Sequence, residues 1–263
     1  MRRLWTRRLA RALGRRSWAG VMAGIGGVLC LAIWTWAVFS GTGSPGQPRD
    51  RALPQTAGAA EMPDGLLRIT VLGTSLTALY DWPARLEAAL TACLDQPVRI
   101  TVIARPGATI AWGADQVAMV AASAPDLVLV EFAINDADLR GGLSPAAAAQ
   151  RHRDLVVGLR AAIAPAPRIV LMTMNPARGP RGWMRPRLAA HYAGYVDLAR
   201  TADLGLVDLY SRWLALPVEA RGLERDGLHP APRVAARIIL PVLVPYLAQT
   251  WRGGCHPVLG RID

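Results

Sequence analysis

The sequence predicts an α/β fold, a three-layer sandwich in which a five-stranded parallel sheet lies between two layers of helices. Five apolar runs of strand length alternate with stretches of helical periodicity in the last three quarters of the chain. Parallel strands need long crossover connections, and these place helices on both faces of the sheet. The hydrophobic content of 52% is sufficient for such a buried core.

The predicted strands are short and rich in Val, Ile and Leu, as is typical of strands buried on both faces. In chain order they are LLRITVLG (66–73), PVRITVIA (97–104), DLVLVEFA (126–133), RIVLMTM (168–174) and GLVDLY (205–210). The predicted helices between them cover residues 82–94, 144–163, 188–202 and 233–250.

An apolar segment near the N-terminus predicts a transmembrane helix that precedes the domain. Seven arginines lie within residues 1–17, a predicted cytoplasmic segment, and residues 18–39 contain no charge. A helix of that length spans roughly 33 Å, enough for a hydrocarbon core of about 30 Å. The arginines predict a single-pass inner-membrane protein with a cytoplasmic N-terminus and an extracytoplasmic domain, periplasmic in a Gram-negative cell. A cleaved signal peptide is the alternative, although its apolar core is usually only about 7–15 residues long.

The segment after the predicted anchor is expected to be a flexible linker. Residues 40–64 are rich in Gly, Pro, Ser and Thr and have no periodicity, so the folded domain is expected to cover residues 65–263. Cys93 and Cys255 lie in that domain, and the sequence leaves open whether they form a disulfide or remain free thiols.

The basic character of the chain does not predict a nucleic-acid partner. The formal net charge is +11, but all 30 basic residues are arginine and seven belong to the N-terminal segment. No recognition motif and no basic patch with interleaved aromatic residues is present. The histidines do not predict a metal or cofactor site either: His152 and His191 fall in predicted helices and are expected at the surface or its boundary, and His256 beside Cys255 supplies only two potential ligands.

Polar residues that suit acyl-transfer chemistry follow the predicted strands, where an open parallel sheet has its functional crevice. Ser75 follows the first strand at a strand-to-helix turn, where its N–H favours negative charge. Serine is a weak nucleophile, but His229 can accept its proton and Asp226 can orient the imidazole. Gly107 and Asn135 follow the second and third strands, and their N–H groups, with that of Ser75, can form an oxyanion hole.

These residues stand in four motifs: GTSLT with Ser75, RPGATI with Gly107, AIND with Asn135, and DGLHP with Asp226 and His229. In order and placement the motifs resemble the four blocks of SGNH hydrolases, also called GDSL esterases and lipases. The resemblance covers about residues 66–248. It implies the flavodoxin-like SGNH hydrolase fold, with Ser75 as nucleophile, Asp226 and His229 as its triad partners, and Ser75, Gly107 and Asn135 as the oxyanion hole.

Three positions depart from the family pattern. Thr74 stands where the family usually has an aspartate, a change common in the superfamily. Arg105 replaces the asparagine two residues before Gly107, which is expected to alter how that loop is held. Ala133 replaces the glycine two residues before Asn135, and its added methyl group is expected to tighten the acyl pocket.

An arginine-rich segment follows the fourth predicted strand. In NPARGPRGWMRPR, residues 175–187, four arginines surround Trp183: Arg178, Arg181, Arg185 and Arg187. Charge beside a stacking surface suits an anionic ligand, such as an acidic glycan or a phospholipid headgroup. The candidate substrate contacts are Arg178, Arg181, Trp183 and Arg185. The other interpretation is a solvated loop or one that touches an anionic membrane.

The sequence therefore predicts a membrane-anchored extracytoplasmic serine esterase that cleaves an O-acyl ester, in particular an O-acetyl ester, on a cell-envelope or exported polysaccharide through an acyl-enzyme. An O-acetyltransferase or a lipid esterase with the same triad is an open alternative. A non-catalytic glycan-binding or assembly module is a third. The expected partners are an acylated glycan or lipid substrate and, through residues 18–39, the membrane; no oligomeric state is predicted.

Overall fold

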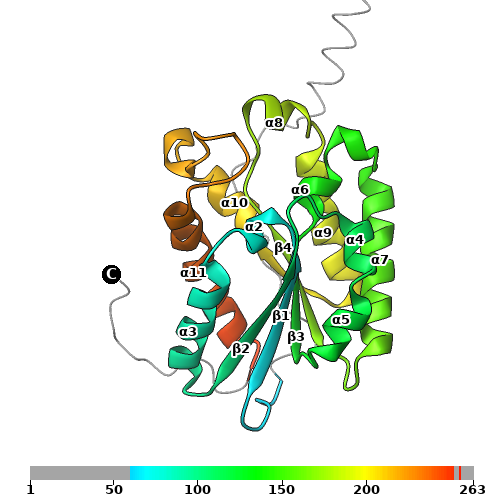
Figure 1. The fold of residues 1–263 in the computed structure, drawn as a ribbon, viewed down its shortest axis with the longest axis vertical. Coiled ribbons are helices and arrows are strands. Elements are labelled where there is room, and N and C mark those ends of the chain that lie inside the picture. The colour runs from blue at the N-terminus through cyan, green and yellow to red at the C-terminus, as the bar shows by residue number, and fades with distance from the viewer. Residues whose placement is uncertain (1–59, 252–254, 256–263) are drawn as a thin grey trace, which may run out of the picture. The chain divides into compact units, whose positions relative to one another are not determined.

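The computed structural model describes residues 60–251 and Cys255. Five parallel strands form one sheet in the order β2-β1-β3-β4-β5, which is the flavodoxin-like order. Helices cover both faces of the sheet (Figure 1). The structure thus confirms the predicted three-layer α/β sandwich with a five-stranded parallel sheet.

Each predicted apolar run forms a strand. The strands are β1 (Leu67–Gly73), β2 (Val98–Ala104), β3 (Leu127–Val130), β4 (Arg168–Thr173) and β5 (Gly205–Asp208). β3 and β5 end two or more residues earlier than predicted because a short helix follows each of them almost at once. After β5, for example, the Asp208 carboxylate accepts the backbone N–H of Ser211 and caps a helix where the sequence predicts continued strand.

The four long helices lie where the sequence predicts them, within two residues at each end. They are α3 (Trp82–Leu94), α7 (Pro145–Ala162), α9 (Leu188–Ala202) and α11 (Pro232–Ala248). α3 and α11 cover one face of the sheet, and α7 and α9 cover the other (Figure 1). Shorter helices connect these layers: α2 (Ser75–Ala78), α4 (Ile110–Ala114), α5 (Val117–Ala122), α6 (Ala133–Asp136), α8 (Gly179–Trp183), α10 (Leu209–Leu214), and the 3-10 turns η1 (Leu139–Gly141) and η2 (Val218–Arg221).

The last five residues of the predicted linker contact the domain instead of lying free of it. Ala60 forms an isolated parallel bridge with Trp251, and its N–H donates to the carbonyl of Thr250 over 3.0 Å. The side-chain amide of Gln96 donates to the carbonyl of Pro63 over 2.7 Å. The domain therefore begins at or before residue 60, because these backbone groups find their hydrogen-bond partners on it.

The rest of the N-terminal prediction falls on residues that the structure does not describe. The arginine-rich segment 1–17, the predicted anchor 18–39 and linker residues 40–59 all precede the described part. Among residues 60–251, no helix combines the length and the apolar character that a membrane crossing requires.

A disulfide joins Cys93 and Cys255 and answers the question that the sequence left open. Cys93 lies in α3, and the two Cα atoms are 4.7 Å apart although 162 positions separate them in the chain. The bridge therefore ties the C-terminal tail to the helix layer that contains α3.

The expectation that His152 and His191 lie at the surface is wrong, because only 1% and 3% of them is exposed. His152 lies on α7, and His191 and Tyr195 lie on α9. These two helices pack against each other, so each covers polar residues of the other that the sequence pattern places at the surface. The His152 ring lies 2.8 Å from both the Ala148 carbonyl and the Tyr195 hydroxyl. Burial lowers the pKa of both histidines to about 4, so both rings are neutral at pH 7.

Candidate active site

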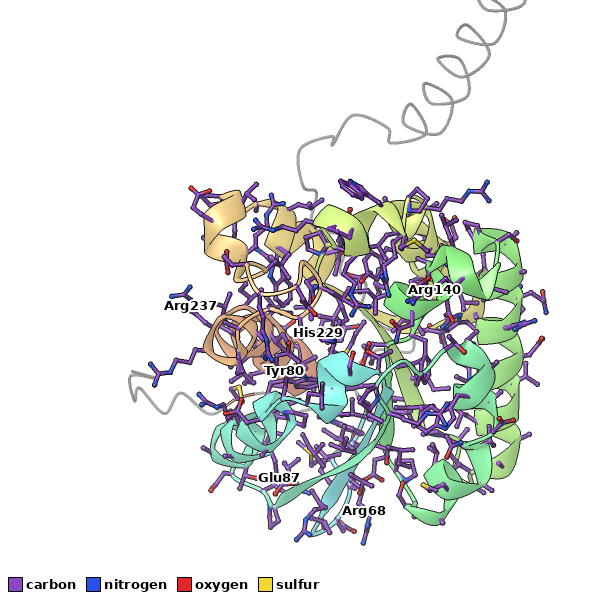
Figure 2. All side chains as sticks on the ribbon, turned by 45° about the horizontal axis from the view of Figure 1, so that its top comes forward. Arg68, Tyr80, Glu87, Arg140, His229 and Arg237 are labelled. Carbon is purple, nitrogen blue, oxygen red and sulfur yellow. A yellow bond between two sulfur atoms is a disulfide. The ribbon has the colours of Figure 1, made fainter. Side chains whose placement is uncertain are left out.

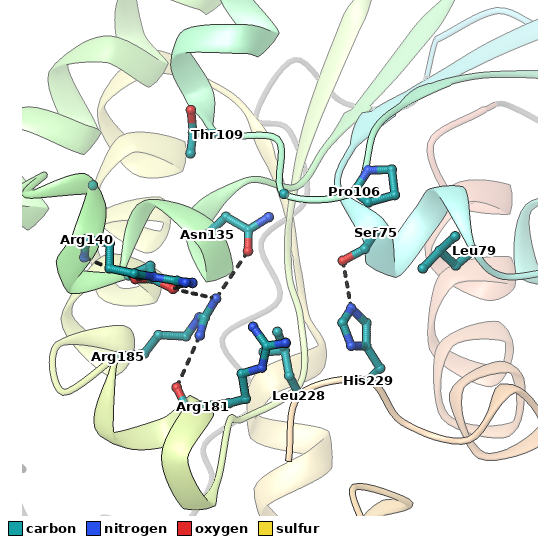
Figure 3. A pocket seen from close by; sticks show the side chains of 13 residues that line it. Ser75, Leu79, Pro106, Thr109, Asn135, Arg140, Arg181, Arg185, Leu228 and His229 are labelled. Carbon is teal, nitrogen blue, oxygen red and sulfur yellow. Dashed lines mark hydrogen bonds and ion pairs between the residues drawn. The ribbon is translucent and has the colours of Figure 1, made fainter. Parts of the chain in front are cut away.

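A pocket of about 460 Å³ at the carboxyl edge of the sheet brings the predicted chemical groups together (Figure 3). Ser75, Gly107, Asn135 and His229 all line it. The first three follow β1, β2 and β3 in that order, and His229 lies in the segment before α11. A parallel sheet has the carboxyl ends of its strands at one edge. Residues far apart in the chain are therefore positioned around one cavity.

Ser75 stands at the sharp connection from β1 to α2. The Thr74 hydroxyl caps the helix by accepting the backbone N–H of Leu76 over 3.2 Å. Ser75 is the first residue of α2, so its own N–H has no partner inside the helix and remains available. The Ser75 Oγ lies 2.9 Å from Nε2 of His229.

Asp226 and His229 complete a chain of hydrogen bonds that begins at Ser75. His229 Nδ1 lies 2.6 Å from Asp226 Oδ2, while Asp226 Oδ1 accepts the backbone N–H groups of Leu228 and His229. Burial alone raises the pKa of Asp226, but the hydrogen bonds from His229 and Leu228 outweigh it and lower that pKa to about 2. The ionised carboxylate accepts only, so Nδ1 carries the proton and Nε2 can accept the Ser75 proton.

Two side chains outside the motifs hold the His229 loop by its carbonyl groups. The Tyr80 hydroxyl donates to the Pro230 carbonyl over 2.8 Å, and Figure 2 shows Tyr80 beside His229. The buried Asn175 amide donates to the Leu228 carbonyl over 2.7 Å. The sequence did not predict that either Tyr80 or Asn175 supports the triad.

The backbone conformation explains why the DGLHP motif has a glycine at position 227. Gly227 has a φ of +76°, and a Cβ at this position would collide with the carbonyl of Arg178. The backbone N–H of Arg178 donates to the Gly227 carbonyl over 2.7 Å. Arg178 thus supports the catalytic loop through its backbone, and its side chain does not line the pocket.

The groups predicted for the oxyanion hole face Ser75 across the pocket. The Asn135 amide donates to the carbonyl of Ala108 over 2.9 Å, which uses one of its two N–H bonds. Gly107 has a φ of +75°, and nothing lies within 4 Å of the position its Cβ would occupy. Together with Ser75, these residues place three N–H donors around one cavity.

Arg185 supports Asn135 and also lines the pocket, so its predicted role as a substrate contact stays a prediction. Its side chain is 3% exposed and forms an ion pair with Asp138 at 3.0 Å. Its guanidinium also donates to the carbonyls of Ile134 (2.7 Å) and Arg181 (3.1 Å) and, more weakly, to Asn135 Oδ1 (3.4 Å). This last contact identifies the oxygen end of the Asn135 amide and leaves its NH₂ group toward the pocket and the Ala108 carbonyl.

Of the other candidate substrate contacts, only Arg181 lines the pocket. Trp183 is 71% exposed and lies outside the lining, as does the side chain of Arg178. Ala133 also lies outside it: this residue is 3% exposed and its N–H donates to the Tyr195 hydroxyl. The expectation that its methyl group tightens the acyl pocket is therefore not met.

Glu131 is a functional candidate that sequence reasoning missed. This residue is 1% exposed and contacts the turn that carries Ser75. Its carboxylate accepts hydrogen bonds from the backbone N–H and the hydroxyl of Thr74 and from the hydroxyl of Thr77, over 2.5 to 3.0 Å. A side chain on Gly73 would collide with Glu131, which explains the glycine of the GTS motif. Burial raises the pKa of Glu131 to about 7, against the lowering by hydrogen bonds from Thr74 and Thr77. The sequence signal that could have revealed this role was an acidic residue near the end of an apolar predicted strand.

A second buried carboxylate, Asp136, lies behind the oxyanion residues. Its Oδ1 accepts the N–H of Ile110 over 2.9 Å. Its Oδ2 has no hydrogen-bond partner among the residues that the structure describes and lies 3.7 Å from His152 Nε2. Burial raises the pKa of Asp136 to about 7, opposed by the Ile110 N–H. No group of three His, Cys, Asp or Glu side chains in the described part of the chain is arranged to hold a metal ion.

The family model of GDSL-like lipases and acylhydrolases matches residues 71–237, a span that contains all four motifs. The chain belongs to this family. No curated protein matches its sequence. Together with the similar solved structures, the family match shows that the chain is a carboxylic ester hydrolase of the SGNH type.

Solved structures of esterases and acylhydrolases share this fold. A lipase/acylhydrolase from Enterococcus faecalis is 22% identical, with a TM-score of 0.57 over 66% of this chain and 94% of that chain. TesA is 25% identical, with a TM-score of 0.53 over 68% of this chain and 99% of that chain. An acetyl esterase mutant with an acetate ion is 18% identical, with a TM-score of 0.57 over 70% and 97% of the two chains.

Proposed function

We propose that this SGNH hydrolase is an extracytoplasmic serine esterase that cleaves short O-acyl esters, in particular O-acetyl groups, on a cell-envelope or exported polysaccharide. The observation that carries the proposal is the continuous set of hydrogen bonds from Ser75 through His229 to Asp226 at the rim of a pocket lined by Asn135 and Gly107. A nucleophile, an oriented base and oxyanion donors are the parts that acyl transfer needs.

In the first half of the reaction, Ser75 Oγ attacks the ester carbonyl while its proton moves to Nε2 of His229. The N–H groups of Ser75, Gly107 and Asn135 stabilise the resulting oxyanion, and the Asp226 carboxylate stabilises the imidazolium. The intermediate then collapses: the ester C–O bond breaks, and the Nε2 proton passes to the leaving alcohol oxygen. An acyl group remains on Ser75.

In the second half, a water molecule attacks the acyl carbonyl and gives its proton to His229. The bond to Ser75 Oγ breaks, the proton returns to Ser75, and a carboxylic acid leaves. The sum is hydrolysis of one ester by one water molecule, and the enzyme ends in its starting state.

The polar and charged side chains among the lining residues of the pocket support a short acyl group and a polar alcohol. Leu79, Pro106 and Leu228 are the apolar side chains of the lining, whereas the other ten lining residues are glycine, polar or charged. A long alkyl chain would leave these polar groups unpaired and would find few partners. An acetylated sugar, whose hydroxyl groups can form hydrogen bonds, suits this lining better than a lipid.

The disulfide supports a location outside the cytoplasm. Bonds such as Cys93–Cys255 persist in oxidising compartments and are rare where thiols are kept reduced. The charge-free segment 18–39 behind its arginine block also supports this location. A membrane-anchored enzyme with this orientation would meet envelope polymers as they are exported.

The decisive experiment compares 4-nitrophenyl esters of two to twelve acyl carbons with the full-length chain and its Ser75→Ala variant. We expect kcat/KM to be highest for acetate and to fall by about 10,000-fold or more in Ser75→Ala, as in other serine hydrolases. Release of acetate from an acetylated polysaccharide, followed by NMR, then tests the glycan substrate. Equal rates with and without Ser75 would overturn the mechanism, and a preference for long chains would indicate a lipid esterase.

A further inference from the structure

Within the described part of the chain, one cation in the pocket has no counterion. Three arginines and one carboxylate line the cavity: Arg140, Arg181, Arg185 and Asp138. Asp138 pairs with Arg140 at 2.7 Å and with Arg185 at 3.0 Å. Among the described residues, the guanidinium of Arg181 has no hydrogen-bond or ion-pair partner.

The backbone around Arg181 is nonetheless well held. Its carbonyl accepts from the guanidinium of Arg185, and α8, which carries it, is tied at Arg178 to the Gly227 carbonyl of the catalytic loop. Figure 3 shows the Arg181 side chain between Asn135 and His229, on the side of the pocket that Arg185 closes. The charge of Arg181 therefore lies on a helix that hydrogen bonds hold both to Arg185 and to the catalytic loop.

From this unpaired charge we infer that the ester substrate carries an anionic group on its alcohol part, bound by Arg181. The inference rests on the proposed esterase function and deepens it, because it predicts acidic esters, such as an acylated sugar acid, as the preferred substrates. Guanidinium donors match a carboxylate or a phosphate in a forked geometry. Asp138 already occupies the other two arginines, so Arg181 is the donor that remains for the ligand.

The test uses three aryl acetates that differ in one substituent: 3-acetoxybenzoate, 3-acetoxyphenyl phosphate and the neutral 3-acetoxybenzamide. Their kcat/KM values are measured with the full-length chain, Arg181→Gln, and the control Arg187→Gln, which removes an exposed charge of the same segment outside the pocket. We expect Arg181→Gln to lower the ratio of anionic to neutral kcat/KM by about tenfold, since a charge-assisted hydrogen bond is lost. The control should change the ratio by less than about twofold.

The two anionic esters distinguish a carboxylate from a phosphate ligand, since the preferred one should lose more in Arg181→Gln. An unchanged ratio for both would overturn the inference and leave the esterase function intact. An equal loss on all three esters would also overturn it, because Arg181 would then act on the reaction and not on the substrate anion.

A binding measurement keeps the inference testable if no ester is turned over, which would instead contradict the proposed function. The hydrolysis products 3-hydroxybenzoate and 3-hydroxybenzamide are titrated into the Ser75→Ala protein by calorimetry. We expect the benzoate to bind about tenfold more tightly than the benzamide, and addition of Arg181→Gln to remove that difference. Equal binding of both products to Ser75→Ala would refute the anion site.

Discussion

One side of the active-site pocket is supported by a buried acidic side chain and the other side by a buried basic one. Below the nucleophile, the Glu131 carboxylate accepts hydrogen bonds from Thr74 and Thr77. On the oxyanion side, the Arg185 guanidinium donates to the carbonyl of Ile134 and to the side chain of Asn135. Each of these two side chains supplies the hydrogen-bond acceptor or donor that unpaired backbone groups beside it require.

The difference follows from the polarity of short helices. The turn into α2 presents N–H groups at a helix N-terminus, and these require an acceptor. α6 and α8 present carbonyl groups that their own few residues do not satisfy, and these require a donor. A carboxylate on one side and a guanidinium on the other therefore hold nucleophile and oxyanion donor in place, and the comparison can be tested variant by variant.

The largest effect is expected on the oxyanion side, where Asn135 itself is proposed to contact the reacting atoms. Asn135→Ala should lower kcat by about 100- to 1,000-fold with a smaller change in KM, because the lost donor acts on the transition state. Steady-state hydrolysis of 4-nitrophenyl acetate measures this. If KM rose and kcat stayed constant, Asn135 would be a binding residue instead.

The next effect is expected from the support of Asn135. Arg185→Lys keeps the charge but loses the fork, and we expect kcat to fall by about tenfold. Because Arg185 acts through Asn135, the same substitution made in the Asn135→Ala protein should change kcat by less than about twofold. Additive effects in this double-mutant cycle would contradict the positioning role and would point to a general loss of structure.

On the nucleophile side, the loss of Glu131 should be felt first in stability. Glu131→Gln replaces an acceptor by an amide donor that faces the hydroxyl groups of Thr74 and Thr77, and leaves part of their hydrogen bonding unmet. We expect the free energy of unfolding in urea to fall by about 1–3 kcal/mol. Glu219→Gln, at an exposed position, is the matched control and should leave the urea midpoint unchanged.

The smallest effect concerns pH. The pKa values of Glu131 and Asp136 are raised to about 7 by burial, from 4.5 and 3.8, so the folded state keeps protons that the unfolded state has lost. The free energy of unfolding should therefore fall as pH rises from about 4 to about 7. Asp136→Asn resembles the protonated form and should make this decline shallower in urea titrations, with little change below pH 4. An identical decline in the variant would show that Asp136 does not titrate in this range.

Much of the fold followed from local pattern. The alternation of apolar strands with amphipathic helices predicted all five strands and the four long helices, because periodicity reports directly on which side of an element is buried. The short helices at the active edge were not predicted. They contain four to six residues, too few for a periodic pattern. The side chains of Thr74 and Asp208 cap α2 and α10, whereas α4, α6 and α8 have no side-chain cap.

The proposed triad was also accessible from sequence, since Ser75, Asp226 and His229 stand in motifs whose order and spacing are specific. Its supports were not. Glu131 is separated from Thr74 by 57 positions, and Arg185 from Asn135 by 50, so no local pattern links them. His152 was misplaced at the surface for the same reason, because the packing of α7 against α9 buries it.

The arginine-rich segment shows where the limit lies. The sequence by itself determined that Arg178, Arg181 and Arg185 would reach the active edge, because they follow a strand of a parallel sheet. Only the tertiary structure decided that Arg185 is buried against Asp138 and that Arg178 supports a loop through its backbone. It also decided that Arg181 alone of the three lines the pocket without a side-chain partner among the described residues. The three residues are chemically identical, and what separates them is which distant carboxylate or carbonyl group the fold brings within hydrogen-bond distance.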